Sequence, residues 1–192
     1  MFQSRRRHRL HEWAVWSLIE DHLESPTGEE FVRTYVDSPG AVGVVVVDAA
    51  SFEDLSGRDP SSVTTVLVSQ YRAPFGEVMW EIPAGMRDVA DEPAETTARR
   101  ELAEEAGLEA DHWRYLGVMA SAPGITNSTV EIFACCGLRE VDHERHGPEE
   151  DHMEVRRLSI ADALDECRRG HITDSKTIIG LQWVVQWAAE SK

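Results

Sequence analysis

The stretch PAGMRDVADEPAETTARRELAEEAGLE, residues 83–109, decides which fold we expect. Eight of its residues are Asp or Glu and three are Arg. Pro93 stands near the first turn of a run of strong helix formers, residues 94–106, and Gly107 follows as a stop signal. The sequence therefore predicts a carboxylate-rich loop that leads into a helix ending at Ala106.

Three carboxylates crowd one side of this predicted helix. At about 3.6 residues per turn, Glu101, Glu104 and Glu105 fall within a sector of roughly 100°. Arg100 can pair with Glu104 one turn later, so a solvated, salt-bridged helix face explains the pattern without any ligand. Spacing alone leaves that explanation open beside a ligand site, and the order of the residues has to decide between them.

Charge and composition limit the classes of partner. The 192 residues suit one compact domain, and 35 Asp plus Glu against 19 Lys plus Arg give a formal net charge of −16. This balance argues against a basic surface that follows nucleic-acid phosphates. No apolar run is long enough for a membrane span, and three cysteines without CxxC spacing fit a reducing cytoplasm. We expect neither a nucleic-acid nor a membrane partner.

Hydrophobic patterning outside residues 83–109 predicts a sheet with helices after it. We interpret QSRRRHR, residues 3–9, as a solvated charged arm and EWAVWSLIEDHLES, residues 12–25, as an amphipathic helix. The extended or β-branched runs that predict strands are residues 29–36, 40–50, 63–72, 77–83, 114–121, 129–138 and 153–160. Residues 40–50 and 63–72 are expected to pair antiparallel. Two helices close the chain, and the last starts at a cap on Asp174 or Ser175 and packs on the sheet.

The order of residues in the central stretch carries a resemblance to a known family. RELAEEAGL, residues 100–108, matches the Arg-Glu-apolar-x-Glu-Glu-x-Gly-apolar core of the Nudix box, and Glu92 precedes Arg100 with seven residues between them. Gly85 stands one residue further from Glu92 than the family pattern has it, which resembles the longer loop of some bacterial ADP-ribose pyrophosphatases. The stretches SPGAVGVVVVD, VLVSQYRAPFGEVMWEIPAG, SAPGITNSTVEIFACCGL and GHITDSKTIIGLQW extend this likeness across most of residues 38–187.

The chain thus resembles the Nudix hydrolase superfamily and, within it, the ADP-ribose pyrophosphatase subfamily. The resemblance implies an α/β class fold, a Nudix α/β/α sandwich with a mixed sheet, over residues 40–192. Residues 1–39 are expected to add an N-terminal helical or extended segment that forms the interface of a homodimer. The apolar side of the helix predicted at residues 12–25 also needs a covering surface.

The resemblance also implies a metal site. Its ligands would be the backbone carbonyl of Ala84 and the carboxylates of Glu101, Glu104 and Glu105, with Glu104 acting through water or on a second ion. A hard cation such as Mg²⁺, or Mn²⁺ in its place, takes such oxygen ligands and shares them with substrate phosphates. Arg100 would orient the glutamates and Glu92 would brace the loop, while Gly85 lets the chain turn tightly.

The implied reaction is hydrolysis of the diphosphate of ADP-ribose to AMP and ribose 5-phosphate, or of a related nucleoside diphosphate sugar. The catalytic base is expected on the irregular loop 139–152, with Glu150 first, Glu149 second and Asp151 third. Arg72 is expected to meet the substrate, and Arg33 is a weaker candidate of the same kind. Tyr35 is a candidate for stacking from a second subunit.

Two other functions stay open. The same machinery could hydrolyse GDP-mannose or another nucleotide sugar, and product identification separates these enzymes. A Nudix-fold sensor would bind ADP-ribose without cleaving it, but the complete glutamate set disfavours that reading. Trp80 is assigned to packing, and the eight histidines show no ligand spacing in the sequence, so none is assigned to a metal.

Overall fold

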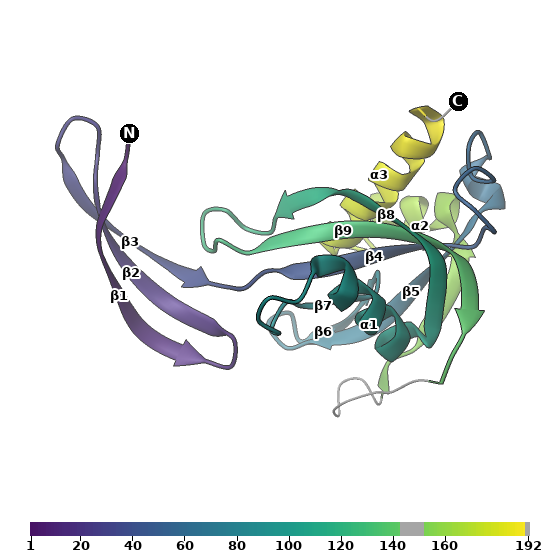
Figure 1. The fold of residues 1–192 in the computed structure, drawn as a ribbon, viewed down its shortest axis with the longest axis horizontal. Coiled ribbons are helices and arrows are strands. Elements are labelled where there is room, and N and C mark those ends of the chain that lie inside the picture. The colour runs from purple at the N-terminus through teal and green to yellow at the C-terminus, as the bar shows by residue number, and fades with distance from the viewer. Residues whose placement is uncertain (143–151, 191–192) are drawn as a thin grey trace.

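The computed structural model describes residues 1–142 and 152–190. Its first three strands form a separate antiparallel sheet in the order β1-β2-β3, called here the N-terminal sheet: β1 Gln3–Trp13, β2 Trp16–Glu24 and β3 Glu30–Asp37. Figure 1 shows this sheet projecting from one side of the molecule. It meets the rest of the chain at the loop before β9, where the amide of Asn127 donates to Asp37 at 2.5 Å.

The prediction of a helix at residues 12–25 is wrong, because this segment forms the turn and the second strand of a β-hairpin. Trp13 pairs with Trp16 across a two-residue turn, and Ala14 in that turn has a φ of 45°. Neither Asn nor Gly marks the turn, so the usual hairpin signal is missing. Burial along β2 alternates strictly from Trp16 to Asp21, the period of a strand. Of the residues expected as a charged arm, all but the half-buried His8 are exposed, and they belong to strand β1.

The body of the molecule is a mixed seven-stranded sheet. Its strands are β4 Ala41–Val47, β5 Thr64–Arg72, β6 Glu77–Glu81, β7 Ala84–Met86, β8 Leu108–Ala120, β9 Thr129–Glu140 and β10 Val155–Ser159. The main order is β10-β5-β4-β9-β8, while β6 pairs with β5 and β7 with β4. Strands β4 and β9 run parallel, and β4 and β5 pair antiparallel as the sequence predicts.

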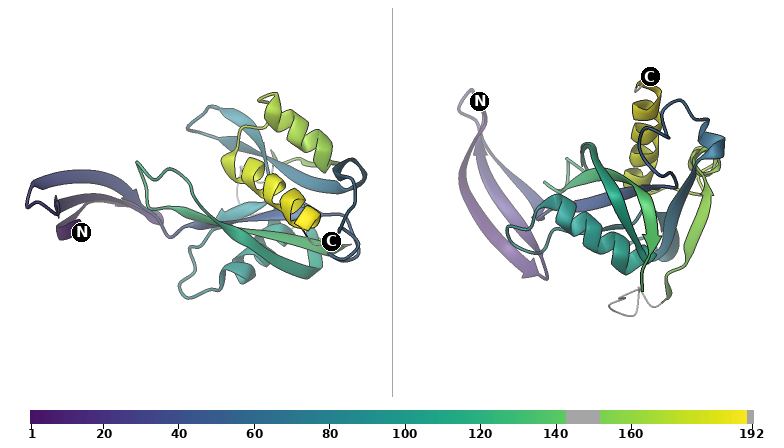
Figure 2. Two further views of the ribbon diagram at one scale, coloured as in Figure 1. Left: turned by 90° about the horizontal axis from the view of Figure 1, so that it is seen from above. Right: turned by 45° about the vertical axis from the view of Figure 1, so that its right-hand side comes forward.

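Helices cover both faces of this sheet. The elements are α1 Ala94–Ala106, α2 Ile160–Arg168 and α3 Ser175–Glu190, with a short 3-10 turn at Pro60–Ser62. Figure 2 shows α2 and α3 side by side on one face, with α1 on the opposite face. The α/β/α sandwich is therefore confirmed. None of the helices in the described part of the chain is long and apolar enough to span a membrane.

The valine run in β4 explains why it occupies the middle layer. Val42, Val44 and Val46 belong to the core cluster under α1, which includes Leu102. Their neighbours Val45 and Val47 belong to the cluster under α2 and α3. Both faces of the strand are buried, so an uninterrupted β-branched run replaces the alternation of a half-exposed strand.

Helix α1, called here the box helix, has the predicted bounds. It begins after Pro93 and ends at Gly107, whose φ of 62° lies in the left-handed region that glycine favours. The N–H of Gly107 donates to the carbonyl oxygen of Ala103 at 3.1 Å and so closes the last turn. This end point places the glutamates of the second half of α1 beside strand β7.

Candidate active site

A cleft of about 550 Å³ opens between the box helix and the start of α3. The sequence-predicted residues in its lining are Arg72, Ala84, Arg100, Glu101, Glu104 and Glu105. They come from β5, β7 and α1, elements that the sheet brings together from distant parts of the sequence. The opposite wall is formed by Asp174, Ser175 and Lys176 at the start of α3.

Glu105 is the most deeply buried carboxylate of α1, with 4% of its surface exposed. Its Oε2 accepts the backbone N–H of Ala84 at 2.8 Å, which ties α1 to β7. The pKa of Glu105 is raised to about 8, chiefly by burial; the Ala84 N–H opposes this shift and the charge of Glu101 adds to it. A cation beside this carboxylate would favour its charged form.

Gly85 lets the loop approach the Glu101 carboxylate. A Cβ at position 85 would lie 2.0 Å from both Cδ and Oε1 of Glu101, far inside van der Waals contact. Only glycine therefore fits beside this side chain as it stands. Because the donors here are carboxylate and backbone oxygens, the chemistry of the site fits a hard cation such as Mg²⁺.

Arg100 holds two of the glutamates. Its Nη1 lies 2.8 Å from Oε1 of Glu101 and 2.9 Å from Oε2 of Glu104. Glu92 accepts a hydrogen bond of 2.7 Å from the hydroxyl of Thr97 and lies 3.9 Å from Arg100. In the described part of the chain, the carboxylate oxygens of Glu101, Glu104 and Glu105, called here the box glutamates, are not gathered within 4.8 Å of one another. Their side chains have to converge further to share one ion.

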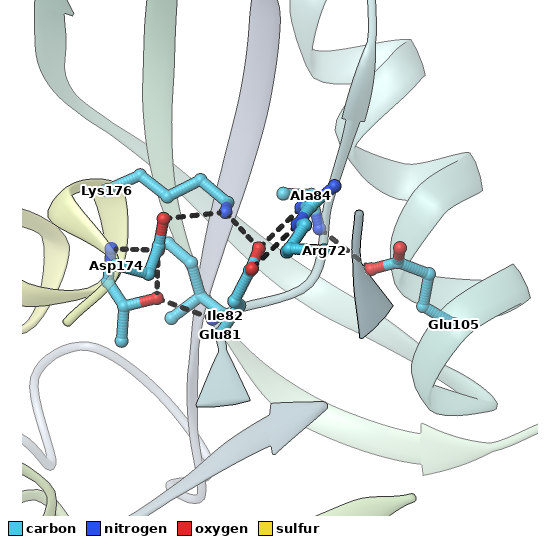
Figure 3. A network of polar contacts seen from close by, with 8 residues as sticks. Arg72, Glu81, Ile82, Ala84, Glu105, Asp174 and Lys176 are labelled. Atoms are coloured by element: carbon cyan, nitrogen blue, oxygen red, sulfur yellow. Dashed lines mark hydrogen bonds and ion pairs between the residues drawn. The ribbon is translucent and has the colours of Figure 1, made fainter. Parts of the chain in front are cut away.

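A buried ion network forms the other side of the cleft (Figure 3). Arg72 donates to both oxygens of Glu81, from Nε at 2.8 Å and from Nη2 at 2.5 Å. Lys176 also donates to Glu81 and lies 3.1 Å from Asp174. Glu81 is 2% exposed, and burial by itself would raise the pKa of its carboxyl. The hydrogen bonds and charges of Arg72 and Lys176 outweigh burial, so the pKa of Glu81 lies below its usual value.

Sequence reasoning missed Glu81, Asp174 and Lys176 as parts of the site. Asp174 was expected only as a helix cap, and its carboxylate does accept the N–H of Thr177 at 2.9 Å. A glutamate inside the apolar strand run EVMWEIP was the available signal for Glu81, because a buried carboxylate needs partners. Trp80 packs against the core as assigned.

The remaining predicted residues lie elsewhere. Arg33 and Tyr35 belong to β3 of the N-terminal sheet and do not line this cleft. The guanidinium of Arg33 lies 4.8 Å from the ring centre of Phe31. Burial, the largest influence on Tyr35, raises the pKa of its hydroxyl. Glu149, Glu150 and Asp151 lie outside the described residues.

Comparison with known proteins agrees with this geometry. The family model described as NUDIX domain matches residues 38–178. The chain is 37% identical over 172 residues to the ADP-ribose pyrophosphatase of Mycobacterium tuberculosis. The alignment covers 90% of this chain and 77% of that protein. The chain is 30% identical over 170 residues to the ADP-ribose pyrophosphatase of Bacillus subtilis, covering 88% and 85% respectively.

The fold also matches a solved structure. A crystal structure described as an ADP compounds hydrolase superposes with a TM-score of 0.77, over 97% of this chain and 93% of that one. The two sequences are 18% identical, so this likeness concerns the fold.

Proposed function

Because the chain belongs to the Nudix hydrolase family, we propose that it hydrolyses the diphosphate of ADP-ribose to AMP and ribose 5-phosphate with the help of a divalent cation. The two ADP-ribose pyrophosphatases among its relatives support this substrate class. The observation that carries the proposal is the cleft itself, which sets the carboxylates of α1 opposite the cations Arg72 and Lys176.

The charges of the two walls suit an anionic substrate with a bound cation. Arg72 and Lys176 both lower the pKa of Glu105, so they act on it electrostatically. Glu81 holds both cations, and Arg72 keeps 36% of its side chain exposed. Arg72 is therefore fixed in orientation and can still donate to a phosphate oxygen, as charge-assisted phosphate recognition requires.

The proposed ligands of the cation are the Ala84 carbonyl and the carboxylates of Glu101, Glu104 and Glu105. When bound, Mg²⁺ or Mn²⁺ supplies neutralisation of phosphate charge and activation of water. Arg100 keeps Glu101 and Glu104 on the cleft side of the helix through its two short ion pairs. Gly85 leaves the room that the Glu101 carboxylate occupies.

The general base is proposed on the loop before β10, with Glu150 ahead of Glu149. This assignment rests on the sequence resemblance. A carboxylate in that role accepts a proton from the water molecule as this water attacks the diphosphate.

Assembly and location complete the proposal. We propose a homodimer in which residues 1–39 form the interface and Arg33 or Tyr35 reaches the partner's pocket. The exposed side chains of Leu10 and Val32 on the N-terminal sheet, and of Phe2 just before β1, support an apolar contact there. All three cysteines are free thiols, which supports a reducing, cytoplasmic setting.

A substrate panel tests the proposed function. ADP-ribose, GDP-mannose, a diadenosine polyphosphate and a nucleoside triphosphate are each incubated with Mg²⁺, and the products are identified. We expect the highest kcat/KM for ADP-ribose. A higher kcat/KM for GDP-mannose would move the substrate assignment to that sugar, and binding of ADP-ribose without any product would indicate a sensor.

A further inference from the structure

Three potential metal ligands meet on the N-terminal sheet, far in sequence from the Nudix box. They are His8, Glu20 and His22, and their ligand atoms all lie within 4.8 Å of one another. In the described parts of the chain, this is the one group of three or more His, Cys, Asp or Glu residues gathered so closely. It combines two imidazoles with one carboxylate, unlike the oxygen donors of the cleft.

Strand pairing explains how the group forms. His8 of β1 stands directly opposite Glu20 of β2 in the antiparallel register. Glu20 and His22 are two residues apart on β2 and so point to the same face of the sheet. Their side chains already touch, with Nε2 of His22 3.0 Å from Oε1 of Glu20. The rings of His8 and His22 are 5.5 Å apart between their centres.

The arginines of β1 leave this group free for a ligand. Three of them pair with carboxylates outside it: Arg5 with Glu24, Arg7 with Asp21 and Arg9 with Glu12. Arg6 is opposite His22 in the register. All three residues of the group are half-buried, so an ion from solvent can reach them.

We propose that His8, Glu20 and His22 form a binding site for Zn²⁺ or another divalent transition metal of similar softness. Two histidines and one glutamate are a recognised zinc ligand set, with the fourth position of the tetrahedron left to water. Bonds of about 2.0–2.2 Å in a tetrahedron set the ligand atoms roughly 3.3–3.6 Å apart. Small side-chain rotations bring the three atoms to that spacing.

An ion at this position would join β1 to β2. The two strands form the outer hairpin of a sheet that projects from the body (Figure 1), and no residue of β1, β2 or β3 belongs to either core cluster. A metal ion that binds the folded hairpin but not the unfolded chain therefore stabilises the folded form by mass action. The site is separate from the cleft, and its existence does not depend on which substrate the enzyme hydrolyses.

Zinc titration of the full chain tests the proposal. The titration uses Glu101→Gln/Glu105→Gln protein as the parent, so that the Nudix box does not compete for the ion. Calorimetry with Zn²⁺ is compared for this parent, for the parent with Glu20→Gln, and for the parent with His22→Gln. The matched control is His11→Gln, because His11 lies on the same strand as His8 but outside the group.

We expect one Zn²⁺ per chain in the parent and in the His11→Gln control. Loss of Glu20 or His22 removes a direct ligand, so affinity falls by more than the roughly 10- to 100-fold that loss of a ligand's outer hydrogen-bond partner costs. Co²⁺ gives a second readout, since the parent develops the visible absorption of a tetrahedral ion and the two ligand variants do not.

Two results would overturn the site. One is equal Zn²⁺ affinity in the parent and in both ligand variants, which means that the ion binds elsewhere. The other is no saturable Zn²⁺ binding by the parent. Circular dichroism of each variant checks that the sheet is intact, and Glu20→Gln keeps nearly the shape of the native side chain, so misfolding does not obscure the result.

Discussion

Gly85 controls how closely the loop before α1 approaches the carboxylate of Glu101. A methyl group at position 85 would overlap that carboxylate, but the carboxylate is the far end of a flexible side chain. We predict that Gly85→Ala folds with a change in stability within about 0.5 kcal/mol and loses activity, because Glu101 turns away from the cleft. Steady-state kinetics and thermal unfolding measure the two effects.

Gly124 provides the matched control for this substitution. A Cβ there meets no atom within 4 Å, and its φ lies outside the left-handed region. Gly124→Ala should therefore leave both activity and stability unchanged. If Gly85→Ala keeps the full rate, Glu101 does not need its present position and the proposed metal geometry is wrong.

Glu81 connects two cations, and its ionisation should govern part of the acid stability. Its folded-state pKa lies below the ordinary 4.5, so its contribution is present above that pH and is lost as pH falls through the lower value. Glu81→Gln leaves Arg72 and Lys176 without their shared carboxylate and should cost about 3 kcal/mol at neutral pH. Urea unfolding of both proteins measures this difference.

The difference between the two proteins should shrink in acid. As pH falls below the ordinary 4.5, the carboxyl of the unfolded chain takes up a proton before the folded one does, so the advantage of the charged carboxylate over Gln declines. A difference in unfolding free energy that stays constant from about pH 7 to about pH 3 would show that Glu81 does not ionise in the way its partners imply.

Among the elements, α1 was predictable and the N-terminal hairpin was not. Helix α1 carries local signals at both ends, Pro93 and Gly107, and these signals act within the chain's own turns. The hairpin depends on Ala14 in a left-handed conformation, and alanine rarely adopts this conformation, so the residue type does not predict the turn. Apolar residues at positions 13, 16 and 19 then imitate a helical period.

The candidate site divides in the same way. The glutamates of α1 follow a recognisable order, so sequence reasoning placed them in one site. The partners Glu81 and Lys176 are 95 residues apart and meet only through the sheet and the start of α3. Cross-strand neighbours such as His8 and Glu20 were likewise invisible while their segment was taken as a helix.

At the scale of the whole molecule, the N-terminal sheet predicts self-association. Large apolar side chains lie exposed on it, and the loop before β9 joins it to the body, where the N–H of Val36 donates to the carbonyl oxygen of Ile125. We predict that light scattering at micromolar concentration gives the mass of a dimer. Replacing Leu10 and Val32 with Ser should shift this mass toward the monomer, because both side chains are exposed in one chain. A fully active monomer would contradict the proposed interface.

The loop between β9 and β10 should supply the catalytic base. We predict that Glu150→Gln lowers kcat by roughly 10²- to 10⁴-fold with little change in KM, as loss of a general base does. Glu149→Gln and Asp151→Asn are the matched comparisons on the same loop. Normal turnover of ADP-ribose by all three variants would place the base elsewhere in the molecule.

The carboxylates of Glu101, Glu104 and Glu105 are proposed to hold the cation with which this cleft hydrolyses a diphosphate. The most direct measurement is phosphorus NMR of ADP-ribose incubated with Mg²⁺ and either the wild-type chain, Glu101→Gln or Glu105→Gln. We predict that the wild type yields equal amounts of AMP and ribose 5-phosphate and that each variant is slower by about 100-fold or more while keeping its fold. Either variant hydrolysing at the wild-type rate in saturating Mg²⁺, or a wild type that releases ADP instead of AMP, would contradict the account.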